Sequence, residues 1–502
     1  MSDTRAYKTD EKIGKEVEAA APSSDWEVVI GLEVHAQISS DSKLFSRSPT
    51  EYGREPNMNV AMYDVSFPGM LPVLNEFCVD QAIKTGLAIE GTINRISIFD
   101  RKNYFYPDLP SGYQISQLYH PIVTDGHVTI EIDGLKKNIN IERIHIEQDA
   151  GKSIHTLSPN NSYIDLNRSG VPLMEIVSKP DMRSAAEAML YVKKLRMILR
   201  YIETCDCSME KGSIRFDANV SIHKPGTPFG NRAEVKNINS IKFLGQAIDY
   251  EVARQIGIVE SGGVVVQETR LFDSVNIETR SMRAKEDSAD YRYFPDPDLK
   301  PVILTEERIE RIRATLPELP DAKKERFIKQ YCIGPVDADV LVEEVKVADL
   351  FEEAVSASRF VDKNSPKLIA NWMISELFAV LNKNNRDISD INFPISYLSE
   401  MVDLIIDGTI SGKIAKTVFA NMVETWRRPE QIISELGLVQ ISDDLVIKRA
   451  IAKVLEDNPN KVTEYKAGKL KLFGFLVGMV MKELHGKGNP KMVNDLLQEA
   501  LR

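Results

Sequence analysis

The stretch Val29-Ile-Gly-Leu-Glu-Val-His-Ala-Gln-Ile38 alternates apolar and polar side chains, and this alternation decides the fold class. Side chains on a β-strand point to opposite faces in turn. The apolar positions therefore lie on one face, and Glu33, His35 and Gln37 lie on the other. The stretch predicts a strand that packs one face into a core and presents possible ligands on the opposite face.

Several other segments divide in the same way. Their polar stripes are Arg143, His145, Glu147 and Asp149; Ser213, Arg215, Asp217, Asn219 and Ser221; and Arg232, Glu234 and Lys236, with Asp165 and Glu175 on two shorter segments. Carboxylates are therefore spread over several predicted strands.

Two interpretations of these stripes stay open at this point. Antiparallel strands commonly have one solvated face, which needs no further function. Pairs such as Glu33 with His35 and Asp217 with Asn219 instead offer oxygen and imidazole ligands suited to a divalent cation beside a phosphate. A shared site would hold Mg²⁺ and bind ATP without a P-loop, because Ile146 stands where the first glycine before Gly151-Lys-Ser153 should fall.

The organisation of the chain predicts an α+β protein in several parts. Short alternating segments from Trp26 to about Asp298 predict an antiparallel-sheet body, and helical periodicity dominates from Thr305 onward. Thr305 is a predicted helix cap, and Pro317 and Pro320 separate this helix from the next. The expected division is a disordered leader 1–25, a catalytic body 26–298, a helical domain 299–395 and a helical tail 396–502.

Composition restricts the setting in which the protein works. The 502 residues contain no apolar run long enough for a membrane span, which needs roughly 18 residues. The four cysteines form no C-x-x-C pair, so a reducing cytoplasm fits best. A net charge of −11 argues against a protein that coats nucleic acid non-specifically, although a local basic face can still bind RNA.

Two regions have features suited to RNA. Aromatic, basic and amide side chains crowd Phe99–Asp108 and Tyr113–Gln117, where they can stack on unpaired bases or form only an edge strand and turn. From Lys461 to Lys491, seven lysines face two glutamates, a local balance of +5 that suits phosphate contact as well as an ordinary solvated helix. The lysines expected to contact RNA phosphates are Lys466, Lys469, Lys471, Lys482 and Lys487.

Read in order, these segments resemble the GatB family, the B subunits of the tRNA-dependent amidotransferases. The resemblance is carried by Gly31–His35, Phe99–Asp108, Asp149–Lys152, Met209–Arg215, Val235–Ser240, Gln267–Arg270, Asp290–Pro295, Ser411–Lys416 and Phe473–Gly478. It implies a cradle body related to glutamine synthetase, a helical domain and a YqeY-like tail. It also implies ATP- and Mg²⁺-dependent phosphorylation of the side-chain carboxylate of misacylated Glu-tRNA or Asp-tRNA, followed by amidation.

The resemblance also suggests roles for particular residues. Metal and catalytic roles carry over to Glu33, His35, Glu147 and Glu234, with Gln148 as a further metal ligand and Asp217 as a further catalytic residue. The expected phosphate-binding cations are Lys152, Arg215 and Lys236. Gln148 departs from the family, which commonly has an acid there. Some members carry a zinc-binding cysteine quartet near residues 45–71, where this chain has Ser46, Ser48, Ala61 and Asp64, so we expect no zinc.

Ammonia must come from another chain, because no amidase or glutaminase signature is found in this sequence. The resemblance implies a glutamine-hydrolysing A subunit and a small C subunit in a heterotrimer. Two alternatives remain: a ligase acting on a free amino acid without tRNA, and a non-catalytic RNA adaptor whose polar stripes are only solvated.

Overall fold

The computed structural model describes residues 25–158, 160–284, 290–361, 364–391, 393–438, 443–485 and 488–501. Nearly all of the expected leader, and Lys487, lie outside these residues. Contacts divide the chain into two compact units that join between Pro320 and Asp321. The first unit contains the sheet, and the second is helical in its described residues.

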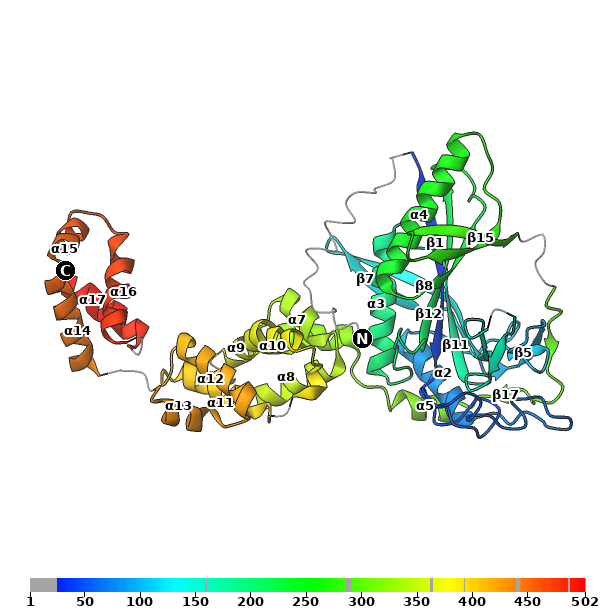
Figure 1. Cartoon of the computed structure of the whole chain (residues 1–502), viewed down its shortest axis with the longest axis horizontal. Helices are drawn as coiled ribbons and strands as arrows, with labels where there is room; N and C mark the ends of the chain where they lie inside the picture. Colours follow the sequence, from blue (N-terminus) through cyan, green and yellow to red (C-terminus); the bar gives the residue numbers. More distant parts are fainter. Residues whose placement is uncertain are drawn as a thin grey trace. The chain divides into compact units, whose positions relative to one another are not determined.

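The first unit is built on one large twisted sheet (Figure 1), whose strand order is β15-β14-β13-β12-β1-β11-β8-β6-β2, with β7 paired to β8. The strands are β1 (Glu27–Gln37), β2 (Thr92–Ile93), β6 (Val123–Thr124), β7 (His127–Ile132), β8 (Leu135–Gln148), β11 (Pro172–Ser178), β12 (Ile214–His223), β13 (Ala233–Ile238), β14 (Glu268–Asp273) and β15 (Glu278–Ala284). β1 lies in the middle, so its polar face is flanked by strands on both sides.

The prediction of an antiparallel sheet is wrong for one pair of strands. β13 and β14 run parallel, whereas the other pairs in this sheet are antiparallel. The long helix α4 (Ile241–Glu260) connects the two, and a parallel pair needs such a crossover. The sheet is therefore mixed, within an α+β unit.

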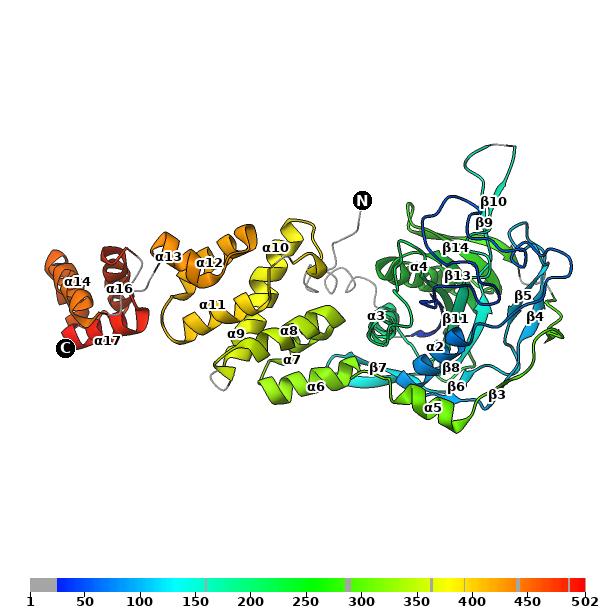
Figure 2. The same cartoon turned by 90° about the horizontal axis from the view of Figure 1, so that it is seen from below.

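The apolar face of the sheet forms the main core. Ile30, Leu32 and Val34 on β1 are at most 1% exposed, as their alternation predicts. Helices α2 (Glu76–Ala88), α3 (Ala185–Tyr201) and α4 contribute to the same core (Figure 2). Asn75, Ser184 and Ser240 cap these helices by accepting backbone N–H bonds, which fixes where each begins.

Smaller elements surround the sheet. They are β3 (Ile96–Ser97) with β17 (Val302–Ile303); β9 (Lys152–Ile154) with β10 (Tyr163–Asp165); and β5 (Tyr113–Ser116), β4 (Asp100–Asn103) and β16 (Phe294–Pro295). Helix α5 (Glu306–Arg313) begins after Thr305, whose hydroxyl accepts the backbone N–H of Arg308, confirming the expected cap. Ile309 and Ile312 join the core of this first unit.

The second unit contains two separate hydrophobic cores. The first is formed by helices α6 (Pro320–Tyr331), α7 (Pro335–Val342), α8 (Val345–Ala357), α9 (Ser365–Trp372), α10 (Phe378–Lys383), α11 (Ser396–Ile406), α12 (Gly412–Thr425) and α13 (Pro429–Leu436), with the π-helix η5 (Met373–Leu377) and the 3-10 helix η6 (Ile388–Asp390). The second is formed by α14 (Asp444–Asp457), α15 (Pro459–Lys466), α16 (Leu472–Glu483) and α17 (Pro490–Leu501).

The expected boundary after residue 395 lies within the first of these cores. The division of the helical part into two domains stays a prediction. Among the described helices, none combines the length and the apolar character needed to cross a bilayer.

Candidate active site

Strand register gathers the predicted polar residues around β1. His35 lies opposite Glu175 of β11 on one side and opposite Arg215 of β12 on the other. Glu33 lies opposite Asp217 of β12, and Glu234 of β13 lies opposite Asn219. The polar face of the sheet therefore carries one continuous row of charged side chains from β13 to β8.

Three carboxylates, Glu33, Asp217 and Glu234, form what we call the acidic cluster. Their ligand oxygens all lie within 4.8 Å of one another. Lys236 Nζ lies 2.5 Å from Asp217 Oδ2 and 2.8 Å from Glu234 Oε1, and Asn219 donates to Glu33 Oε1 at 3.0 Å. The Lys236 ammonium group thus pairs with two of the three acids.

The acidic cluster is short of positive charge. Burial, followed by repulsion from Glu175 and Glu234, raises the pKa of Glu33 despite the attraction of Lys236. Burial opposes the charge on Lys236, but Asp217 and then Glu234 raise the pKa of its ammonium group. Oxygen ligands crowded in this way suit a hard divalent cation such as Mg²⁺, whose charge would relieve their repulsion.

A second group, the histidine cluster, consists of His35, Glu147 and Glu175 together with His145. Glu175 Oε2 lies 3.2 Å from His35 Nε2 and 3.5 Å from His145 Nε2. Glu147 lies 3.6 Å from the same nitrogen of His145 and accepts a bond from Ser116 at 3.0 Å. His35, Glu147 and Glu175 also have ligand atoms within 4.8 Å of one another.

Both imidazoles favour the charged form. Burial by itself would lower the pKa of His35, but the Glu175 carboxylate outweighs burial and raises it to about 9. Glu175 and Glu147 act in the same way on His145, whose pKa is also raised to about 9. Near neutral pH two imidazolium groups therefore face two carboxylates, so this cluster is better balanced than the acidic cluster.

Basic and aromatic side chains lie beside the histidine cluster. Lys102 of β4 has a raised pKa because Glu147 and nearby tyrosines outweigh burial. Its ammonium group lies 5.0 Å from the ring centroid of Tyr291 and 5.8 Å from that of Tyr104. The exposed Phe105 and Tyr106 follow Tyr104 in the chain. The aromatic segment noted in the sequence thus lies next to the charged row.

Arg215 binds Asp149 at one end of the polar row. Its guanidinium group donates to Asp149 at 2.8 Å, and Gln37 donates to the same carboxylate oxygen at 3.1 Å. Burial opposes ionisation of Asp149, but Arg215 and Arg168 lower the pKa of its carboxyl group. Arg215 is therefore a fixed cation in the same polar row.

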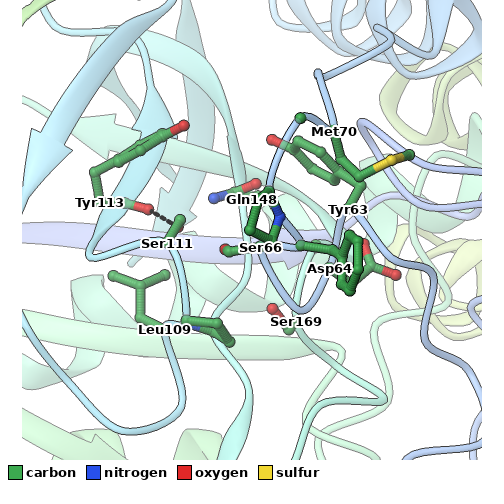
Figure 3. A pocket seen from close by; sticks show the side chains of 14 residues that line it. Tyr63, Asp64, Ser66, Met70, Leu109, Ser111, Tyr113, Gln148 and Ser169 are labelled. Carbon is green, nitrogen blue, oxygen red and sulfur yellow. Dashed lines mark hydrogen bonds between the residues drawn. The ribbon is translucent and has the colours of Figure 1, made fainter.

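Gln148 and Lys152 are not members of either cluster as defined above. Gln148 alternates with Glu147 on β8 and lines a pocket of about 230 Å³ together with Tyr63, Asp64 and Tyr113 (Figure 3). Lys152 is exposed on β9 in a separate two-stranded sheet. The structure thus brings together Glu33, His35, Glu147, Asp217 and Glu234, but not these two residues.

The predicted tRNA-binding lysines that the structure describes are all exposed. Lys466 ends α15, Lys469 and Lys471 lie between α15 and α16, and Lys482 lies near the end of α16. Lys469 pairs with Glu464 at 3.1 Å, so its charge is partly countered.

Two residues of the histidine cluster were absent from the predicted site, although both lay on recognised polar stripes. Glu175 and His145 face each other across β11 and β8. Their importance follows from strand order, which brings together positions distant in sequence. Alternation placed each on a polar face, but it did not show which strands would pair.

The neighbourhood where some family members bind zinc contains a buried ion pair. Lys43 Nζ lies 3.1 Å from Asp64 Oδ2, and their side chains are 0% and 1% exposed. The same oxygen accepts bonds from the Ser46 hydroxyl at 3.2 Å and the Ala61 backbone N–H at 2.8 Å. Asp64 thus joins the segments of this loop, and the expected lack of zinc stays a prediction.

The fold and clusters together define a class of protein: a multidomain α+β enzyme with grouped acids, imidazoles and cations on one face of a sheet. The chain belongs to the GatB family, because residues 28–310 match the family described as the GatB/GatE catalytic domain and residues 349–501 match the GatB domain.

Curated relatives agree with this assignment. Proteins named as the B subunit of aspartyl/glutamyl-tRNA(Asn/Gln) amidotransferase include one from Zymomonas mobilis, 53% identical over 95% of this chain and 98% of that protein. The protein of that name from Rickettsia bellii is 54% identical over 95% and 98%, and that from Pelagibacter ubique is 53% identical over 95% and 97%.

Proposed function

We propose that the chain is the B subunit of an aspartyl/glutamyl-tRNA amidotransferase, which converts misacylated Glu-tRNA(Gln) or Asp-tRNA(Asn) into the amide form. The observation that carries this proposal is the presence of an acidic cluster and a histidine cluster on one sheet face, in a chain of this family. ATP phosphorylates the side-chain carboxylate, and ammonia then displaces phosphate.

Activation is needed because a carboxylate is a poor acceptor for ammonia, whereas an acyl phosphate has a good leaving group. We assign Mg²⁺ to Glu33, Asp217 and Glu234, where it would neutralise charge on the transferring phosphoryl group. Lys236, the lysine already held by two of these acids, would then bind phosphate oxygens. His35 is paired with Glu175 and would supply positive charge beside the reacting carboxylate.

The nucleoside of ATP has a suitable pocket next to the acidic cluster. Residues that line a cavity of about 320 Å³ include Glu33, Asn219, Phe229, Asn231 and Gln267. Phe229 is 58% exposed and offers a ring face for a purine base. Binding there would direct the phosphates toward Glu33 and Lys236.

The remaining components come from other molecules. The ammonia donor is a glutamine-hydrolysing A subunit, joined through a small C subunit, and the substrate is the misacylated tRNA. The exposed lysines of the tail, Lys466, Lys469, Lys471 and Lys482, support tRNA binding through phosphate contacts.

The test combines this chain with candidate A and C partners, ATP, Mg²⁺, glutamine and separately charged Glu-tRNA and Asp-tRNA, and follows amide formation on the tRNA. We expect product that depends on both ATP and tRNA. Glu33→Gln should abolish it, whereas Glu27→Gln, on the same strand and outside both clusters, should not. Amidation of a free amino acid without tRNA would favour a small-molecule ligase. Full activity of Glu33→Ala with His35→Ala would favour an RNA adaptor.

A further inference from the structure

Thr269 contacts one carboxylate of the acidic cluster. Its hydroxyl donates to Glu234 Oε2 at 3.0 Å, and the two residues are register partners across β13 and β14. Thr269 is only 4% exposed. The other oxygen of the same carboxylate, Oε1, faces Lys236 at 2.8 Å.

These two contacts orient the Glu234 carboxylate. A glutamate side chain rotates about three bonds, so it needs a fixed neighbour to present one chosen oxygen. Because Oε2 is bound by Thr269, Oε1 is the oxygen turned toward Lys236, which also contacts Asp217. A hydroxyl that donates to a ligating carboxylate fixes its direction.

The strand that carries Thr269 is itself anchored from the opposite face. Arg270, the next residue, lies 3.3 Å from Glu251 Oε2 of α4 and donates to the Thr279 hydroxyl of β15 at 2.8 Å. Glu251 is fully buried and also binds Arg254 and Gln255. β14 is therefore held from this side by several contacts, of which the Thr279 hydroxyl is only one, while its Thr269 side chain meets the acidic cluster on the other side.

We propose that Thr269 is a positioning residue for the cation site, which holds Glu234 in the orientation that completes the acidic cluster. The inference rests on the proposed function, since it concerns the cation that this function requires. It also gives a physical reason for the threonine in the segment Gln267–Arg270, whose first member lines the neighbouring 320 Å³ pocket.

The test compares Thr269→Val, which keeps the shape and removes the hydroxyl, with Thr269→Ser, which restores it. Mn²⁺ binding to the full chain, followed by electron paramagnetic resonance, should weaken on the order of 10-fold in the valine variant. The serine variant should return close to the wild-type affinity. In the assembled complex, the Mg²⁺ concentration needed for half-maximal amidation should rise by a similar factor.

Thr279→Val is the matched control, because it removes an equally buried threonine hydroxyl from the anchoring network on the opposite side. It should lower the thermal unfolding midpoint while leaving Mn²⁺ affinity within about 2-fold of the wild type. The inference is overturned if Thr269→Val binds Mn²⁺ like the wild type, if serine fails to rescue, or if Thr279→Val weakens binding equally. Lack of amidation by the wild-type complex would instead reject the proposed function.

Discussion

His35 on β1 and Glu175 on β11 face each other across the centre of the sheet, with Nε2 and Oε2 3.2 Å apart. The same carboxylate oxygen lies 3.5 Å from His145 on β8. One carboxylate thus contacts two imidazoles from two strands. These contacts raise the pKa of both imidazoles and favour their charged forms.

The first prediction concerns the titration of His35. Its pKa of about 9 exceeds the ordinary value of about 6.5. The stability gained by charging it is therefore fully present below about pH 6.5 and is lost as pH rises through about 9. Glu175→Gln should lower the pKa of His35. The loss of stability as pH rises through about 9 should then disappear. NMR titration of the full chain without divalent cations checks the shift, with Glu27→Gln as a control that should leave it unchanged.

The second prediction separates the two roles of Lys236. Its ammonium group lies between Asp217 and Glu234, where it competes with a divalent cation for the same oxygens. Lys236→Met should bind Mn²⁺ severalfold more tightly in the absence of ATP. The same variant should lose on the order of 100-fold in amidation by the complex, because a phosphate-binding charge is gone. Lys236→Arg keeps the charge, so tighter Mn²⁺ binding there would contradict electrostatic competition.

The third prediction concerns the buried pair of Lys43 and Asp64. Removing one partner leaves an uncompensated buried charge, which typically costs about 3–5 kcal/mol. Lys43→Met should therefore lower the free energy of unfolding by about that amount in denaturant titrations. Combining Lys43→Met with Asp64→Asn should recover most of the loss. A double variant as unstable as the single one would show that the charge pairing is not the cause.

The fourth prediction concerns the tail. Replacing Lys466, Lys471 and Lys482 together by alanine should weaken tRNA binding and make its salt dependence less steep by about one unit for each lost phosphate contact. The KM for tRNA should rise, while kcat at saturating tRNA stays near the wild-type value. Lys448→Ala is the control, because Lys448 is already paired with Asp444 on α14. An unchanged salt dependence would show that these lysines do not contact the tRNA phosphates.

Alternation alone predicted the division of β1 into a buried and a polar face, because burial of one sheet face requires it. The helix cap at Thr305 was equally local, since it depends on a hydroxyl and a backbone N–H three residues apart. Strand order was not predictable in this way. The meeting of Glu175 with His35 depends on which distant segments pair, and no local pattern specifies that.

For Gln148, strand alternation was a better guide than the family pattern. The polar stripe on β8 contains His145, Glu147 and Asp149, so alternation already turned Gln148 toward the other face. The family pattern favoured it as a ligand, and the structure instead places it beside Tyr63 and Tyr113. Thr269 was missed because its role depends on the parallel pairing of β13 with β14, which requires the α4 crossover.

The central claim is that the side-chain carboxylate of the aminoacyl-tRNA is activated by phosphorylation on this sheet. The direct test charges tRNA with glutamate carrying ¹⁸O at both oxygens of its side-chain carboxylate and analyses the phosphate released by the assembled complex with ATP and glutamine. We predict one ¹⁸O atom in inorganic phosphate for each amide formed. The Glu33→Gln variant should give neither the amide nor the labelled phosphate. Amide formation without ¹⁸O in phosphate would contradict the account.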